Sequence, residues 1–141
     1  MRRIVGPVLA SLTLAACGGS DAAPRAAATG ADPRSVITDC GTFNLPQGDG
    51  LPDSAARCLV EAVQARHAAR LKVTRPTTEG DPIHVTYTAG GDGRVEVITD
   101  SRQDRFTGPT NRIITRQTCT GPIGTLRLDF AECSEPTPTL E

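Results

Sequence analysis

Six charged residues in two short segments have the most obvious capacity for chemistry in this chain. They are Glu79 and Asp81 in one segment, and Asp100, Arg102, Asp104 and Arg105 in the other. Carboxylates act as general acids or bases or bind cations, and guanidinium groups bind carboxylates in a bidentate manner. Arginines this close keep carboxylates ionised, which suits binding a small ligand, a cation or a partner's charged group better than catalysis. The same residues can also form only a structural network of ion pairs and turns.

Other signatures of chemistry are missing from the sequence. It contains no GxSxG elbow, no glycine-rich phosphate loop, no HExxH and no calcium-loop spacing. His84 lies on the polar face of a predicted strand, diagonal to Glu96, where a solvated histidine is a simpler interpretation than a general base. His67 is expected near a helix C-terminus, where positive charge is favourable. We expect no cofactor, no metal site and no assigned catalytic residue.

Alternating apolar and polar residues predict the strands that position the two charged segments. These strands are expected around residues 70–74, 83–88, 94–99, 112–119 and 126–131. The Gly90–Gly93 break predicts a hairpin turn. Pairing centred on Gly91 places Tyr87 opposite Val95 and Val85 opposite Val97, so polarity matches across the pairs near the turn. The same register places Ile83 opposite Thr99 at the open end. The charged segments would then meet at the open end of the hairpin.

One helix is predicted to begin at Asp53, whose side chain can cap the first turn, and to end near residues 66–69. Apolar residues recur at the spacing of one buried helical face: Ala55, Cys58, Leu59, Ala62 and Val63. The expected fold is α+β, with one N-terminal helix packed on a four- to five-stranded, mainly antiparallel sheet and stapled by disulfides.

The cysteines indicate disulfide bonds rather than a zinc site, because they lack zinc-ligand spacing. Of the 5 cysteines, four lie in the predicted domain: Cys40, Cys58, Cys119 and Cys133. Four cysteines allow three pairings, and proximity favours Cys40–Cys58 with Cys119–Cys133. Each bridge would stabilise the domain by about 3 kcal/mol. A tight turn at residues 121–124 would leave Cys133 out of reach of Cys119, so either that connection is wide or the cysteines pair differently.

The N-terminus has the pattern of an export signal. Arg2 and Arg3 precede an apolar stretch that is too short to span a membrane, and small residues follow. Leu14-Ala15-Ala16-Cys17 resembles a bacterial lipobox, which implies that Cys17 becomes the acylated first residue of the mature chain. The alternative is an ordinary secretory signal cleaved near Ala16. We therefore expect a signal peptide at 1–16 and a lipidated, flexible tether at 17–35. A globular domain at 36–134 and a disordered tail at 135–141 would follow.

The charge balance argues against a nucleic-acid partner. The chain has 15 basic and 16 acidic residues, and removing Arg2 and Arg3 leaves 13 basic residues. Nucleic-acid binding draws most of its affinity from clustered positive charge, and base stacking needs aromatic residues, which are few here. We expect a monomer whose contacts are the membrane, through lipidated Cys17, and a surface protein or small ligand.

Several of these segments resemble an uncharacterised domain-of-unknown-function family of small lipoproteins from Gram-positive bacteria. The resemblance rests on Thr78–Ile83 with its GDPI segment, on Asp100–Phe106 with its D-x-x-x-D-R-F pattern, and on Tyr87, Gly93 and Cys119. It covers roughly residues 69–119 and implies no activity, substrate or catalytic residue. The arginine-rich, alanine-rich composition is typical of a GC-rich genome such as an actinobacterial one.

The leading functional hypothesis is a non-enzymatic, lipid-anchored extracytoplasmic module that binds a ligand or partner at the cell surface. The alternative is a small cell-envelope hydrolase that uses the clustered carboxylates with His84. An inhibitor or immunity-type module is a third hypothesis.

Overall fold

The computed structural model describes residues 36–123 and 128–139. The predicted signal peptide, Cys17 and the predicted tether lie outside this part of the chain. The elements in order are β1 (Thr38–Asn44), α1 (Asp53–Gln64), β2 (Ala69–Pro76), β3 (Pro82–Ala89), β4 (Arg94–Asp100), a single 3₁₀ turn (Pro109–Asn111), β5 (Ile114–Ile123), β6 (Asp129–Cys133) and β7 (Thr137–Pro138).

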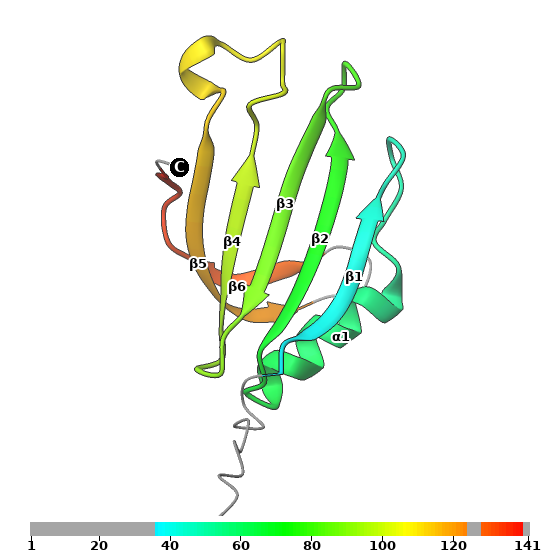
Figure 1. Cartoon of the computed structure of the whole chain (residues 1–141), viewed down its shortest axis with the longest axis vertical. Coiled ribbons are helices and arrows are strands. Elements are labelled where there is room, and N and C mark those ends of the chain that lie inside the picture. The colour runs from blue at the N-terminus through cyan, green and yellow to red at the C-terminus, as the bar shows by residue number, and fades with distance from the viewer. Residues whose placement is uncertain (1–35, 124–127, 140–141) are drawn as a thin grey trace, which may run out of the picture. The chain divides into compact units, whose positions relative to one another are not determined.

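The strands form one sheet in the order β1-β2-β3-β4-β5-β6, and β7 also pairs with β5 (Figure 1). β1 and β2 run parallel, with α1 as the crossover between them, and the other pairs are antiparallel. The α+β prediction is confirmed in this broad form. Two details were wrong: the described sheet has seven strands rather than four or five, and α1 follows a strand instead of preceding all of them.

Two described strands, β1 and the short β7, were not predicted, and the sequence of β1 does not alternate cleanly. Its pairing with β2 shifts register between Asp39 and Thr42. Gly41, inside this irregularity, has a φ of 104°, which favours glycine. Cys40 is the one residue of β1 that is buried. A bulge therefore interrupts the period of two on which the strand prediction depended.

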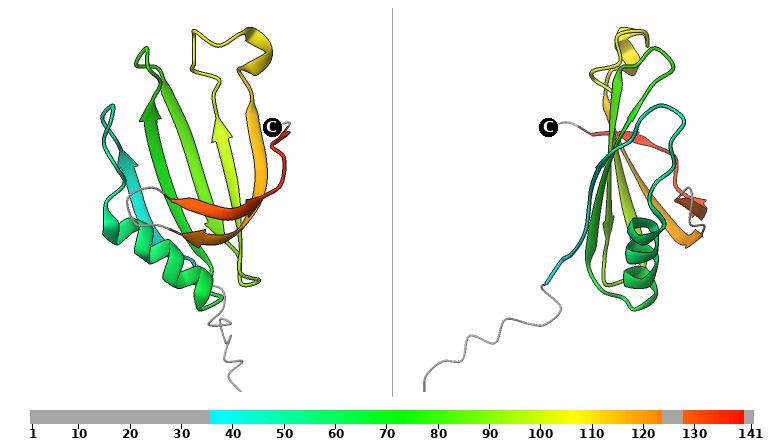
Figure 2. Two further views of the ribbon diagram at one scale, coloured as in Figure 1. Left: turned by 180° about the vertical axis from the view of Figure 1, so that it is seen from behind. Right: turned by 90° about the vertical axis from the view of Figure 1, so that its right-hand side faces the viewer.

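Helix α1 packs its apolar side against one face of the sheet (Figure 2). Its buried residues are Ala55, Ala56, Leu59, Ala62 and Val63. The predicted cap was wrong: Asp53 is the first helical residue, it follows Pro52, and no side chain caps this end. Its carboxylate still lies in the first turn, where negative charge is favourable. Cys58 bonds to Cys40 and so joins α1 to β1.

The core lies between α1 and the sheet. Its most completely buried large side chains are Leu51, Leu59, Leu71, Val73, Val95 and Cys119. The rings of Tyr87 and Phe130 stack beside these side chains, with 6.2 Å between the ring centroids. On the sheet face away from α1, alternate residues such as Arg70 and Lys72 are exposed.

The hairpin between β3 and β4 forms, but its register differs by two residues from the predicted one. Tyr87 pairs with Val97 rather than Val95, and Ala89 pairs with Val95. The turn is set by Asp92, whose Oδ1 accepts a hydrogen bond from the Arg94 N–H at 3.0 Å, and by Gly93 with a φ of 82°. The turn is therefore centred on Asp92, one residue beyond the predicted centre.

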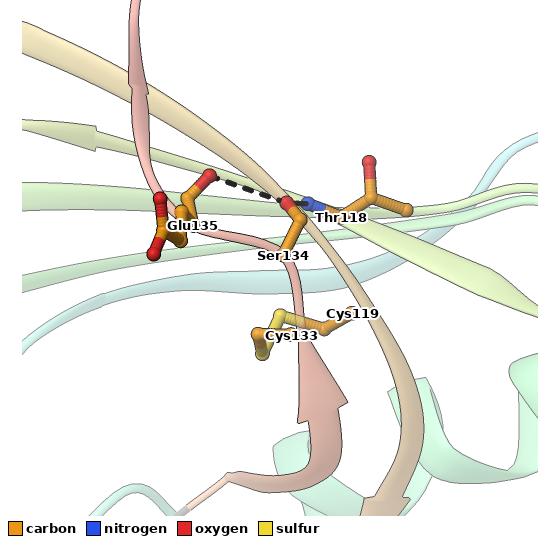
Figure 3. The surroundings of a disulfide bond; sticks show 5 residues. All are labelled: Thr118, Cys119, Cys133, Ser134 and Glu135. Carbon is orange, nitrogen blue, oxygen red and sulfur yellow. Dashed lines mark hydrogen bonds between the residues drawn. A yellow bond between two sulfur atoms is a disulfide. The ribbon is translucent and has the colours of Figure 1, made fainter.

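The second disulfide resolves the question about the β5–β6 connection. Cys119 and Cys133 are directly paired across the two strands and are bonded (Figure 3). β5 continues through residues 121–123, where a tight turn was considered, and Ile123 pairs with Asp129. The connection thus lies farther along the chain, and both proximal disulfides are confirmed.

The described residues that follow Cys133, which include part of the predicted tail at 135–141, are paired with β5. The Ser134 hydroxyl accepts a hydrogen bond from the Thr118 N–H at 3.0 Å (Figure 3). Farther on, Thr137 and Pro138 form β7 opposite Arg116 and Thr115. Threonine and proline carry no apolar pattern that would predict a strand, whereas β5 offers them an open hydrogen-bonding edge.

Candidate functional site

The two charged segments occupy neighbouring loops at one end of the sheet. Residues 77–81 connect β2 to β3, and residues 101–113 connect β4 to β5, at the top of Figure 1. Because β3 and β4 are adjacent and antiparallel, the start of one lies beside the end of the other. The predicted meeting of the two segments is therefore present in the structure, despite the change of register.

Asp81 is the central residue of this loop pair and is only 3% exposed. Its Oδ2 accepts a hydrogen bond from the Arg105 backbone N–H at 2.8 Å, and its Oδ1 accepts one from Arg105 Nε at 2.9 Å. Arg105 Nη2 lies 2.8 Å from the same Oδ1. The hydrogen bonds from Arg105 hold the pKa of Asp81 below its ordinary value, against the opposing effect of burial.

The loop that carries Asp81 is folded by its own hydrogen bonds. The Thr77 hydroxyl accepts a bond from the Asp81 N–H at 3.1 Å. The Thr77 N–H in turn donates to the Asp81 carbonyl oxygen at 2.8 Å. Gly80 has a φ of 93°, which completes the turn. Asp81 is thus held just before β3 by its own loop as well as by Arg105.

Asp100, the last residue of β4, forms a second ion pair with Arg102 at the start of the other loop. Asp100 Oδ1 accepts hydrogen bonds from the Arg102 backbone N–H and Nε, each at 3.0 Å, and Oδ2 accepts one from Nη2 at 2.7 Å. The side-chain hydrogen bond from Arg102 is the main reason that the pKa of Asp100 is lowered, and nearby His84 contributes in the same direction.

Asp104 fixes the backbone on both sides of Phe106. Its Oδ1 accepts hydrogen bonds from the N–H groups of Phe106 and Thr107, each at 3.0 Å. The carbonyl oxygen of Arg105 accepts a hydrogen bond from Arg112 Nη2. Phe106 nevertheless projects outward and is 68% exposed. The loop is therefore fixed by polar contacts while its aromatic side chain faces solvent.

Two other candidates behave differently from their predictions. Glu79 is exposed, and within the described residues its carboxylate joins none of these ion pairs. His84 is paired with Asp100 across the sheet, because of the shifted register, and is not diagonal to Glu96. Its Nδ1 lies 2.9 Å from the Thr74 hydroxyl, and its Nε2 lies 3.3 Å from Gln103 Nε2.

These ion pairs and hydrogen bonds suit holding the loop in a fixed shape better than they suit catalysis. Asp81, Asp100 and Asp104 already accept hydrogen bonds from the loops, and the first two are held ionised by arginines. What the loops present outward is Phe106 beside the exposed side chain of Arg105. Phe106 was not among the residues predicted from the sequence, although Asp104, two positions before it, is a signal for an Asx turn.

Comparisons with known proteins provide no relative. No protein-family model matches the chain, and no curated protein or solved structure matches it either. The resemblance to the small lipoprotein family therefore stays a prediction.

Two further features of the described residues bear on the site. Among residues 36–123 and 128–139, no three His, Cys, Asp or Glu side chains are grouped so that they could hold a metal ion. In the same part of the chain, no helix has the length and apolar character needed to cross a membrane.

Proposed function

We propose that this protein is a lipid-anchored extracytoplasmic binding module that contacts a partner protein through Phe106 and the loop around it. The two disulfides support an oxidising compartment outside the cytoplasm. The lipobox-like segment at Cys17 supports attachment to a membrane. In this proposal Asp81, Asp100, Asp104 and Arg102 hold the loop in place, Arg105 also borders the contact surface, and Glu79 has no assigned role.

The observation that carries the proposal is an exposed aromatic side chain on a loop that is already fixed. Aromatic residues and arginine are common among the residues that dominate protein interfaces. A loop ordered before binding loses less conformational entropy when the partner arrives, so more of the contact energy appears as affinity. The hydrogen bonds from Phe106 and Thr107 to Asp104, and from Arg105 to Asp81, supply this order.

Crosslinking in cells tests the proposal. A photo-reactive amino acid at Thr110, an exposed position in the same loop, should capture a discrete protein that mass spectrometry identifies. Phe106→Ala should reduce that capture at least tenfold, as expected for an interface residue worth more than about 1.4 kcal/mol. The matched control is Ile123→Ala, which removes another exposed apolar side chain, 58% exposed, outside the loop.

Two outcomes would overturn the proposal. One is the absence of any discrete crosslinked protein, and the other is equal capture by the parent chain and the Phe106→Ala variant. The hydrolase alternative predicts instead that Asp81→Ala or Asp100→Ala abolishes turnover while Phe106→Ala leaves it unchanged.

A further inference from the structure

The opposite end of the sheet contains a cavity of about 650 Å³. The described residues that line it come from three segments that are far apart in sequence. Val36 and Thr38 contribute from the start of β1, residues 65–68 from the connection after α1, and Gly91 from the β3–β4 turn. These segments lie at the bottom of Figure 1, where β1 and β2 begin and β3 ends.

The side chains around this cavity are apolar and basic. Val36 is 72% exposed and the adjacent Ile37 is 47% exposed. Arg66, His67 and Thr38 supply the polar lining, and none of the described lining residues is acidic. Glu61 borders a smaller neighbouring hollow, which His67 also lines. Val36 and Ile37 thus offer exposed apolar surface next to an arginine and a histidine.

Arg66 has an unusual backbone conformation for its residue type. Its φ is 55°, and it is the single non-glycine residue with positive φ in the described part of the chain. It ends α1 in a Schellman motif, in which the His67 N–H donates to the Ala62 carbonyl at 2.8 Å and the Arg66 N–H donates to the Val63 carbonyl at 3.1 Å. Glycine is the usual residue at this position. A strained arginine at the cavity is a reason to look for a role of its side chain.

The point at which the N-terminal segment joins the domain indicates what the cavity end of the sheet faces. Residues 18–35 lie between Cys17 and Val36, so the proposed lipid anchor connects to the domain at this cavity. The loop with Phe106 lies at the other end of β3, whose eight residues span about 25 Å. A membrane at the cavity end would leave the Phe106 loop directed away from it.

We infer that this end of the domain docks on the phospholipid surface to which the chain is anchored. Arg66 and His67 contact headgroup phosphates, and Val36 and Ile37 enter the boundary between headgroups and acyl chains. This end of the domain has mixed charge, because acidic residues lie nearby: Glu61, Asp39 and Asp92. The contact is therefore local and does not depend on long-range attraction. The anchor keeps the domain at high effective concentration near the surface, and weak contacts are then sufficient. This inference rests on the lipid anchor of the proposed function.

Fluorescence offers a direct test, because the chain contains no tryptophan. A single Val36→Trp substitution in the full lipidated protein gives one reporter at the cavity, and Phe106→Trp gives the matched reporter at the other end. Each variant is reconstituted into vesicles of phosphatidylcholine and phosphatidylglycerol, with or without brominated acyl chains. The emission of the cavity reporter should shift to the blue, and brominated lipid should quench it several-fold more strongly than the loop reporter. Equal quenching of the two reporters, or stronger quenching of the loop reporter, overturns the inference.

Arg66→Gly, introduced into the Val36→Trp variant, separates docking from a purely structural role. Because glycine adopts positive φ without strain, this change should raise Tm by a few degrees. It should at the same time lower the quenching of the cavity reporter several-fold, because the guanidinium is lost. Arg57→Gln is the charge-matched control on an exposed position of α1, and it should leave the quenching unchanged. Unchanged quenching after Arg66→Gly would contradict a phosphate contact at this residue.

Co-sedimentation distinguishes failure of docking from failure of the anchor. If the lipidated protein sediments with vesicles but the cavity reporter is not quenched, the anchor stands and the docking inference is wrong. If the protein does not sediment with vesicles, the anchor itself is wrong and the docking inference falls with it. Capture of a partner through the Phe106 loop is measured independently of both.

Discussion

At the scale of single residues, Asp81 is the group on which the loop network depends most. Its folded-state pKa lies below its ordinary value of 3.8, so the folded state binds the proton less well than the unfolded chain does. The stability that this carboxylate contributes is therefore fully present above about pH 4. It is lost as the pH falls through the lowered pKa. Asp100 acts in the same direction.

Asp81→Asn should lower Tm by several degrees at neutral pH, because it leaves the Arg105 hydrogen bonds without their ionised partner. It should also flatten the decline of Tm below pH 4, since one of the carboxylates responsible has been removed. Thermal unfolding followed by circular dichroism between pH 7 and pH 3 measures both effects. Glu79→Gln is the control from the same loop and should follow the parent protein. An acid decline in Asp81→Asn as steep as that of the parent would argue against this role.

The sequence was sufficient to name these residues but not to assign their partners. The meeting of the two charged segments was predictable, because the start of one strand lies beside the end of its antiparallel neighbour. Asp100 pairs with Arg102 inside one loop, whereas Asp81 reaches Arg105 across 24 positions. The pairing of each arginine with its carboxylate depends on the geometry of the turns. Residue spacing does not indicate that geometry.

At the scale of elements, the β3–β4 hairpin shows that a pattern of apolar and polar residues predicts strands but not their register. A register shift of two residues returns every side chain to the same face of the sheet, so polarity matching is satisfied equally well by either pairing. The deciding contact is the hydrogen bond from the Arg94 N–H to Asp92 inside the turn. The strand positions and buried faces were therefore predictable, while the register needed the turn.

The two disulfides are expected to stabilise different elements. Replacing Cys119 and Cys133 by alanine should lower the free energy of unfolding by about 2–4 kcal/mol. The loss should be accompanied by faster amide exchange in β6, because this strand pairs only with β5 among the described strands. Replacing Cys40 and Cys58 should instead loosen β1 and α1. Urea titration and hydrogen exchange with mass spectrometry measure the two effects.

The comparison between the two disulfide variants is the internal control. If loss of either bridge accelerated exchange in the same segments, the two halves of the sheet would form one cooperative unit. The assignment of each disulfide to its own elements would then be wrong. Proximity in sequence was a correct guide to the pairing here because each bridge joins neighbouring elements of the fold.

At the scale of the whole molecule, the two ends of the sheet carry separate proposed tasks. Changes at sites this far apart, with no shared contacts, usually add independently. Phe106→Ala should therefore leave the quenching of the cavity reporter unchanged, and Arg66→Gly should leave partner capture unchanged. The test is to measure both variants in the quenching assay and in the crosslinking assay. A change in both assays from either variant would show that the two ends are coupled through the sheet.

The bulge in β1 has a consequence for the lipid anchoring that we propose. Among the described strands β1 pairs only with β2, so its other side is a free edge to which a neighbouring copy could add a strand. Gly41 and the register shift beside it interrupt the regular spacing of that edge. Copies brought together by the proposed anchor would meet this irregular edge, which is a poor template for adding a strand and so disfavours aggregation.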